Sequence, residues 1–168
     1  MPVTPEENIA QLERAFSQIE AGAAAAANAM ARYIAERTAQ DTLTRNKHAP
    51  GAYHRARPGA PPSYASGSLA NAMFWTPASA GLKTSAIVGN SDKRARVFEF
   101  GGCVLRPTSG SHLGWKDTGR KDNPSGIWRH RMVDLDDAHP FLGPTTDEAI
   151  DDGELRQVAI DEFRKYDP

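Results

Sequence analysis

The sequence predicts an α+β protein with a long N-terminal helix, a small antiparallel sheet of about four strands and a C-terminal helix. Three patterns predict it: helical apolar spacing over residues 4–40, short β-type runs over 66–101, and an amphipathic pattern within 139–168. The 168 residues are enough for a single domain, 1–168, with a core of its own. Fourteen glycines and twelve prolines also predict much loop.

The N-terminal segment 4–40 carries the signals of a helix start. Thr4 can cap the helix, Pro5 suits its first position, and Glu7 completes a capping box with Thr4. Apolar residues then recur every three or four positions: Ile9, Leu12, Phe16, Ile19, Ala23, Ala26, Met30, Tyr33 and Ile34. The small residues at 21–27 allow close approach, either of another subunit or of an element of the same chain, and we favour the same chain.

The segment 41–65 reads as an irregular basic loop because proline and glycine interrupt every period. Its candidate contact residues are Arg45, Lys47, Arg55 and Arg57, with Tyr53 and Tyr64 interleaved. Such a loop can contact nucleic acid, or it can be an arm laid over a neighbouring subunit.

The segment 66–101 is expected to form the sheet. Residues 84–89 read as a strand, 66–75 as a turn followed by a strand or short helix, and 94–100 as an apolar run that ends at two glycines. The insertion 102–138 is rich in turn formers and contains two short candidate strands. It therefore predicts an extended hairpin or arm that projects from the sheet.

The last segment, 139–168, is expected to be a connector followed by a helix. Pro140 and Pro144 bracket an apolar pair, Phe141 and Leu142, that we expect to enter the core. Thr145 is the expected cap of a helix that runs to about residue 166. Gly153 should weaken the first turns of that helix by about 1 kcal/mol.

Charge is distributed in three blocks although the net charge is only −1. Residues 1–44 carry −3, residues 45–131 carry +10 and residues 132–168 carry −8. The basic middle can face a polyanion, pair with the acidic ends of a neighbouring copy, or be ordinary solvated charge. The chain has no apolar run of 18 residues and no secretory signal, and its single cysteine excludes an internal disulfide. We therefore expect a protein that is made and used in a reducing cytoplasm, or released from one.

Signatures of catalysis are missing from the sequence. It has no phosphate-binding loop, no dinucleotide fingerprint and no nucleophile elbow, and no histidine has a partner at helical spacing. His130 near Asp134, Asp136 and Asp137 offers a weak cation site, for which a solvated turn is the simpler interpretation. Cys103 is read as a small packed residue. We expect no enzyme, no cofactor and no metal.

The order of several short motifs resembles the neck, or tail-completion, family of long-tailed bacteriophages over nearly the whole chain. The motifs are Ser66-Gly67-Ser68-Leu69, Val88-Gly89, a run ending Glu99-Phe100-Gly101, and Pro140-Phe141-Leu142-Gly143-Pro144. Four departures are Ser66 for the usual Thr, Ala95-Arg96 for an aromatic-Ala pair, Gly143 where a basic residue is common, and a segment 102–138 that is longer than expected between the last two motifs. These motif residues make sense as structure, with Gly101 in a turn or at positive φ.

The resemblance implies a structural virion protein, made in the host cytoplasm, that forms a ring between the head connector and the tail tube. Its partners would be copies of itself, six by tail symmetry, the connector or stopper protein, and the tail terminator or tube protein. DNA would only pass through the lumen, and no membrane would be involved. The alternatives are a tail terminator that caps the tube, a basic nucleic-acid-binding module, and a small metal enzyme.

Overall fold

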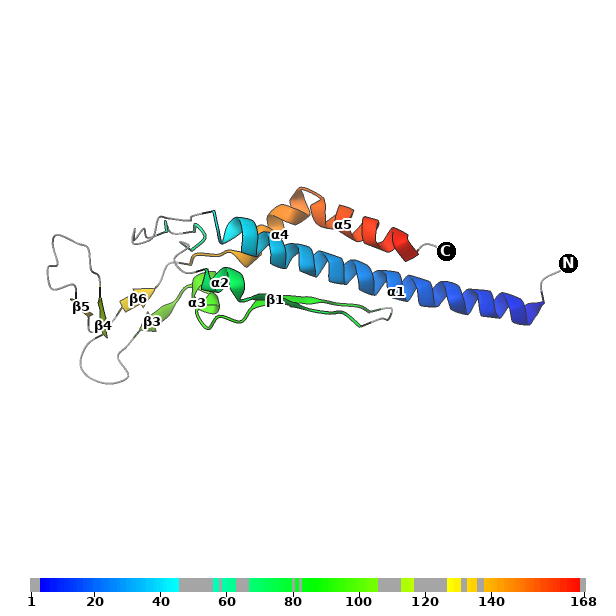
Figure 1. Cartoon of the computed structure of the whole chain (residues 1–168), viewed down its shortest axis with the longest axis horizontal. Coiled ribbons are helices and arrows are strands. Elements are labelled where there is room, and N and C mark those ends of the chain that lie inside the picture. The colour runs from blue at the N-terminus through cyan, green and yellow to red at the C-terminus, as the bar shows by residue number, and fades with distance from the viewer. Residues whose placement is uncertain are drawn as a thin grey trace.

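One long helix forms the axis along which the rest of the chain packs (Figure 1). The computed structural model describes residues 4–45, 56–57, 59–62, 67–79, 81, 83–105, 113–116, 127–130, 133–135 and 138–166. Helix α1 spans Pro5–Arg37 and begins with the predicted capping box. The backbone N–H of Glu7 donates to Thr4 Oγ1 (3.3 Å), and the backbone N–H of Thr4 donates to Glu7 Oε2 (2.8 Å). The predicted long N-terminal helix is therefore confirmed.

The end of this helix widens into a single π-helical segment, η1, over Thr38–Thr42. The Thr38 side chain is fully buried there, and within the described residues its hydroxyl has no hydrogen-bond partner. The rod formed by α1 and η1 thus ends two residues beyond the predicted limit of residue 40. The π-helical segment carries the chain directly into Leu43, which is buried in the core.

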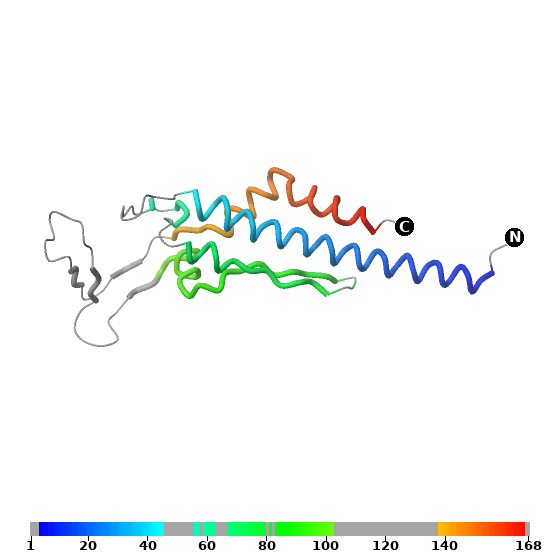
Figure 2. The backbone as a smooth tube through the Cα atoms, in the orientation of Figure 1, coloured from blue at the N-terminus to red at the C-terminus, as the bar shows by residue number. Residues whose placement is uncertain are grey.

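A two-stranded antiparallel ribbon covers one side of α1. Strand β1 (Met73–Thr76) pairs with β2 (Ile87–Asn90), with Phe74 opposite Gly89 and Trp75 opposite Val88. A hydrogen bond from the backbone N–H of Ala78 to Asn28 Oδ1 (2.6 Å) links the ribbon to α1. Figure 2 shows the ribbon running beside the middle of α1, with the C-terminal helices on the other side.

The predicted sheet of about four strands is not supported. The described strands form three separate two-stranded sheets instead. Besides β1 and β2, strand β3 (Cys103–Leu105) pairs with β6 (Val133–Leu135), and β4 (Leu113–Lys116) pairs with β5 (Ile127–His130), all antiparallel. In the 102–138 insertion the two outer strands, β3 and β6, therefore pair with each other, and the two inner strands, β4 and β5, do the same. This is the pairing of a chain that folds back on itself. Its projection as an arm stays a prediction.

A second error concerns the apolar run before the two glycines, which is a helix and not a strand. Helix α3 spans Ala95–Phe100. Asp92 precedes it and accepts from the backbone N–H of Arg94 (2.9 Å) through its carboxylate. Ala95 is buried and Phe98, three residues later, packs on the core. The turn at Asp92 and this helical spacing outweigh the strand propensity of the valine and phenylalanines.

The C-terminal helix is two helices. Helix α4 spans Leu142–Asp151 and α5 spans Glu154–Phe163, followed by a 3₁₀ turn, η2, over Arg164–Tyr166. Gly153 separates them with φ +75°, so it breaks the helix that it was expected only to weaken. Thr145 is not the cap, because α4 begins three residues before it and Thr145 lies buried inside the helix.

The small-residue stretch of α1 packs within the chain, as we favoured. Helix α5 lies along α1 (Figures 1 and 2), and the terminal turn η2 also contacts α1. A Cβ atom on Gly22 would lie 3.0 Å from Cε2 of Phe163 and 3.2 Å from Cβ of Tyr166. Ala26, one turn further along the same face of α1, is also buried. Small side chains thus let the two helices approach closely.

Replacing Gly22 by leucine is expected to lower the free energy of unfolding by about 1–3 kcal/mol, because the new side chain collides with Phe163 and Tyr166. Replacing Gly22 by alanine is the milder control, since the methyl contact is offset by a helix-propensity gain of about 1 kcal/mol. Urea denaturation measures both effects. Equal stability of Gly22→Leu and wild type would contradict the close packing of α5 on α1.

Candidate functional site: the junction of the motif segments

Residues that are distant in sequence meet in a small core where η1, the short helix α2 (Ser68–Asn71), α3 and α4 converge. Phe141 and Leu43 are each 2% exposed and Ala95 is 7% exposed. Partly buried side chains pack around these three: Leu69, Ala70, Met73, Phe98 and Leu142. The expectation that Phe141 and Leu142 enter the core is confirmed. Each motif segment contributes a residue to this junction except Val88-Gly89, two neighbouring residues of strand β2.

The carboxylate of Glu99 caps helix α4 from another part of the chain. Its Oε2 accepts from the backbone N–H groups of Phe141 (2.9 Å) and Leu142 (3.1 Å), and its Oε1 accepts from that of Gly143 (2.8 Å). The next residue is Pro144, which has no N–H to satisfy. The first four residues at the start of α4 therefore leave no backbone N–H group without an acceptor.

This contact also joins two of the motifs to each other. Glu99 comes from the run ending at Gly101, and the donors come from the segment that opens α4. A Cβ on Gly143 would lie only 3.1 Å from Glu99 Oε1, so a small residue suits this close approach. The segments are locked further where the backbone N–H of His139 donates to the carbonyl of Phe98 (2.6 Å).

Two glycines of the motifs have backbone conformations that favour glycine. Gly67 has φ +72° and lies at the start of α2, the short helix Ser68–Asn71. Gly101 has φ +66° and ends α3, which confirms the expected positive φ although the preceding element is a helix. Both glycines therefore turn the chain abruptly next to the core.

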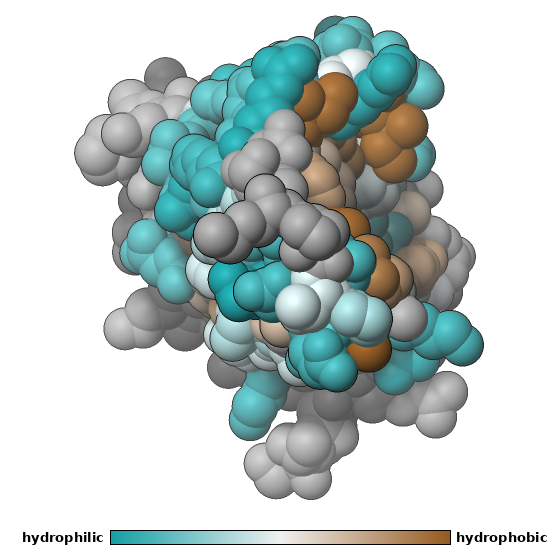
Figure 3. Space-filling model, turned by 90° about the vertical axis from the view of Figure 1, so that its right-hand side faces the viewer, coloured by the Kyte–Doolittle hydropathy of each residue, from teal (hydrophilic) through white to brown (hydrophobic). Residues whose placement is uncertain are grey.

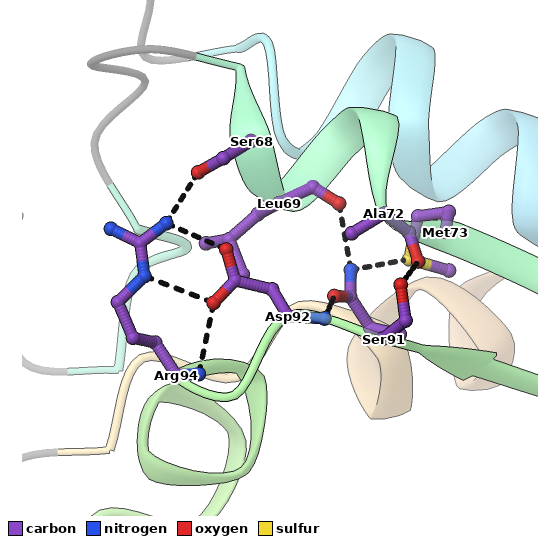
Figure 4. A network of polar contacts seen from close by, with 8 residues as sticks. Ser68, Leu69, Ala72, Met73, Ser91, Asp92 and Arg94 are labelled. Atoms are coloured by element: carbon purple, nitrogen blue, oxygen red, sulfur yellow. Dashed lines mark hydrogen bonds and ion pairs between the residues drawn. The ribbon is translucent and has the colours of Figure 1, made fainter.

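A polar network joins one end of the ribbon, where β1 begins and β2 ends, to α2 (Figure 4). Arg94 donates from Nε to Asp92 Oδ1 (2.9 Å) and from Nη2 to Asp92 Oδ2 (2.6 Å), and it also donates to the hydroxyl of Ser68. Asn90 donates from Nδ2 to the carbonyl of Leu69 (2.7 Å). The network fixes the motif turn at Ser68 against the turn that precedes α3.

The hydrogen bonds from Arg94 hold the pKa of the Asp92 carboxyl well below its usual range. A carboxyl whose pKa is depressed by folding stabilises the native state above its unfolded pKa of about 4. That contribution is lost as the pH falls below about 4, because the unfolded chain then binds a proton that the folded chain does not.

Replacing Asp92 by asparagine is therefore expected to destabilise the protein at pH 7 more than at pH 3. The measurement is the unfolding midpoint of wild type and variant at both pH values. Replacing Asp147 by asparagine is a matched control, since Asp147 is exposed and its carboxylate forms no ion pair within the described residues. An Asp92→Asn difference that stays constant between pH 7 and pH 3 would contradict the assigned ion pair.

Sequence reasoning missed a second polar cluster, which ties the end of α1 to α4 and α5. Arg37 lies 3.3 Å from Glu148 Oε2 and forms an ion pair with Glu154. The hydroxyl of Tyr33 donates to Glu154 Oε2 (2.7 Å) and accepts from Arg37 Nη1 (3.3 Å). A basic residue in the last turn of a long helix, with an acidic C-terminal block, was the available signal.

A buried pair of threonines completes the junction. Thr145 donates its hydroxyl to the carbonyl of Phe141 (2.6 Å), so Thr42 must be the donor in the 2.6 Å contact between their hydroxyl oxygens. The contact joins η1 to α4. Thr145 therefore has a structural function inside α4 and is not the helix cap that the sequence predicts.

The remaining predicted residues do not join this junction. Val88 and Gly89 lie in β2. The ring of Phe74 covers Gly89 so closely that a Cβ atom on Gly89 would lie 2.9 Å from Cζ of Phe74. Phe100 is 77% exposed. Among the arm candidates, Arg45 and Arg57 are exposed, whereas Lys47 and Arg55, like Ser66, lie outside the described residues.

No candidate catalytic centre emerges from the described part of the chain. No three His, Cys, Asp or Glu residues there are placed to hold a metal ion. The side chains of Cys103, His130 and Asp134, together with Asp136 and Asp137, lie outside what is described. An open groove of about 250 Å³ between α1, β1 and α5 is lined partly by Asn28, Trp75 and Tyr166. It contains no cluster of reactive groups.

Comparison of the chain with protein-family models, curated proteins and solved structures found no match to any of them. Among the described helices, none combines the length and the apolar character needed to cross a bilayer. The assignment of function therefore depends on the residues themselves.

Proposed function

We propose that this chain is a structural subunit of a bacteriophage neck ring that completes the tail and joins it to the head connector. The ring would surround the channel through which DNA leaves, with six copies in register with the tail. The protein would be part of the virion and would assemble in the host cytoplasm. Its partners would be its own copies, the head connector or stopper protein, and the tail terminator or tube protein.

The main support is the physical connection between the motifs that carry the family resemblance. Glu99 of one motif caps the helix that the other motif opens, and Phe141 of that second motif is fully buried in the junction core. Residues whose order alone suggested the family thus serve one folding function together. The fold therefore brings these motifs into direct contact.

The distribution of charge and apolar surface also suits an assembly subunit. The acidic and basic blocks are separated along the chain, and α1 carries large exposed apolar residues at its N-terminal end. Opposite charges on different surfaces favour head-to-tail contacts, which close into a ring when the rotation between subunits permits. Tight DNA binding is not expected, because a lumen that held DNA firmly would impede its exit.

The test is electron microscopy of a lysate from a phage that lacks this gene, with a plasmid copy of the gene as the control. Filled heads beside separate tails of normal length are the expected result. Overlong tubes would instead assign the protein to the tail terminators. Normal infectious particles would overturn the neck assignment altogether.

A further inference from the structure

The N-terminal end of α1 exposes a row of large apolar side chains. Ile9, Leu12, Phe16 and Ile19 follow one another at spacings of three, four and three, so they share one face of the helix. Their exposed fractions are 57%, 59%, 60% and 45%. We call these four residues the N-terminal stripe. Figure 1 shows this end of α1 extending past both α5 and the ribbon, so neither covers it.

Figure 3 views the molecule from the end at which α1 begins, and it shows hydrophobic groups at the surface with polar groups around them. Single exposed apolar residues are ordinary, but a contiguous row on an ordered helix marks an interaction surface. The helix is well specified locally, since it has the capping box at Thr4 and a Pro at its start. The stripe is thus presented on a preformed helix and needs a partner to cover it.

Charge beside the stripe restricts what that partner can be. Glu6, Glu13 and Glu20 recur every seven residues, each next to a stripe position, so they form an acidic row along one edge. Two copies of the stripe packed antiparallel would bring their acidic rows together. A parallel pair would place these rows opposite Asn8, Ala15 and Gly22, which carry no positive charge. A partner that adds positive charge to an apolar surface fits better.

The described part of the same chain offers such a surface at α3. Arg96 and Phe100 lie four residues apart in α3, Lys93 lies in the turn before it, and all three are exposed, Phe100 to 77%. Within the described residues neither Lys93 nor Arg96 has an ion pair. We call these three residues the basic face. Exposed Phe163 and Tyr166 differ, because the cations between them, Arg164 and Lys165, already pair with carboxylates of the same helix.

We propose that the N-terminal stripe of one copy binds the basic face of the next copy, with the acidic row against Lys93 and Arg96. This inference rests on the proposed ring and names the contact that builds it. The two surfaces lie on different parts of the chain, so each copy uses one surface toward each neighbour. Such a head-to-tail contact extends until rotation closes it into a ring. Attraction between exposed charges also predicts weaker association at high salt.

Mixing two complementary variants of the full chain tests the polarity of the contact. Phe16→Glu disables the stripe and Phe100→Glu disables the basic face, and each alone should weaken self-association at least tenfold, as for a central interface residue. Their equimolar mixture should form a one-to-one dimer and nothing larger, since only one intact pair of surfaces remains. Light scattering after size exclusion measures the masses. Gln18→Glu, on another face of α1, is the control and should assemble as wild type.

Charge reversal tests the electrostatic part separately. Glu6→Lys with Glu13→Lys, or Lys93→Glu with Arg96→Glu, should each weaken self-association by about tenfold at low salt, and all four changes in one chain should restore it. The proposed pairing would be overturned if the variant with all four changes did not recover self-association. It would also be overturned if Gln18→Lys weakened self-association as much as the charge reversals do.

The outcomes separate this inference from the neck assignment. Wild-type rings that persist in Phe16→Glu and Phe100→Glu would overturn the contact and leave the ring in place. A Phe100→Glu variant that still forms dimers through its stripe would overturn the head-to-tail polarity. A wild-type monomer at every concentration would overturn the contact, and the gene-deletion phenotype then decides the neck assignment independently.

Discussion

Replacing Phe141 by alanine is expected to lower the free energy of unfolding by about 3–5 kcal/mol. Phe141 is the largest fully buried side chain of the described residues and contacts the core formed with Leu43 and Ala95. Its removal loses apolar burial and leaves a cavity that the surrounding helices fill only in part. A typical domain has only about 5–15 kcal/mol of stability in total, so this variant should be close to unfolding at 37 °C.

Urea denaturation followed by far-UV circular dichroism measures this effect, with Phe100→Ala as a matched control. Phe100 is 77% exposed, and its truncation should change the stability of the dilute protein by no more than about 0.5 kcal/mol. Phe141→Leu, which keeps most of the apolar volume, should fall between the two. Equal losses for Phe141→Ala and Phe100→Ala would contradict the assigned core.

The parts of the fold that depend on neighbouring residues could be predicted from the sequence. The capping box of Thr4 and Glu7 lies within one turn, and the structure forms it as predicted. The entry of Phe141 into the core also followed from its position between two prolines. These signals are local, because the residues that carry them lie close together in the sequence.

The parts that depend on distant residues could not be predicted in this way. Thr145 has the sequence signature of a cap, but Glu99, more than forty residues earlier, supplies the acceptors for α4. The run of α3 has strand-forming residues, yet Asp92 and the contact of Phe98 with the core make it a helix. Tertiary contacts of this kind override local propensity.

The candidate site shows the same division. The motif residues could be identified one by one, but their meeting at a single junction depends on the fold. The ion cluster of Arg37 with Glu148 and Glu154 was missed because its members are more than a hundred residues apart. The basic residue in the last turn of α1 and the acidic C-terminal block were the sequence signals of such pairing, and they do not specify which residues meet.

Replacing Glu99 by alanine is the second change for which we expect a large effect. Three backbone N–H groups at the start of α4 would lose their common acceptor, at partly buried positions that exclude most water. Bonds to a charged acceptor contribute about 1.5–3 kcal/mol each, and relaxation of the helix start recovers part of that. The expected loss in free energy of unfolding is therefore about 2–4 kcal/mol.

The fold offers a control and a more specific readout for this prediction. Glu36 lies exposed on α1 with only a distant ion pair to Arg32 (4.0 Å), so Glu36→Ala should cost no more than about 0.5 kcal/mol. Hydrogen exchange of the amides of Phe141, Leu142 and Gly143 should accelerate in Glu99→Ala more than that of the Thr4 capping box. Glu99→Gln keeps one carbonyl acceptor and should lie between alanine and wild type.

These outcomes distinguish a cap from a general packing contact. If Glu99 acted only by filling space, glutamine, which has nearly the same shape, would restore both stability and amide protection fully. If it acts as the cap, glutamine must fall short, because its amide nitrogen presents donors to a helix start that already carries only donors. Full restoration by Glu99→Gln would therefore contradict the capping function, and with it the physical link between the two motifs.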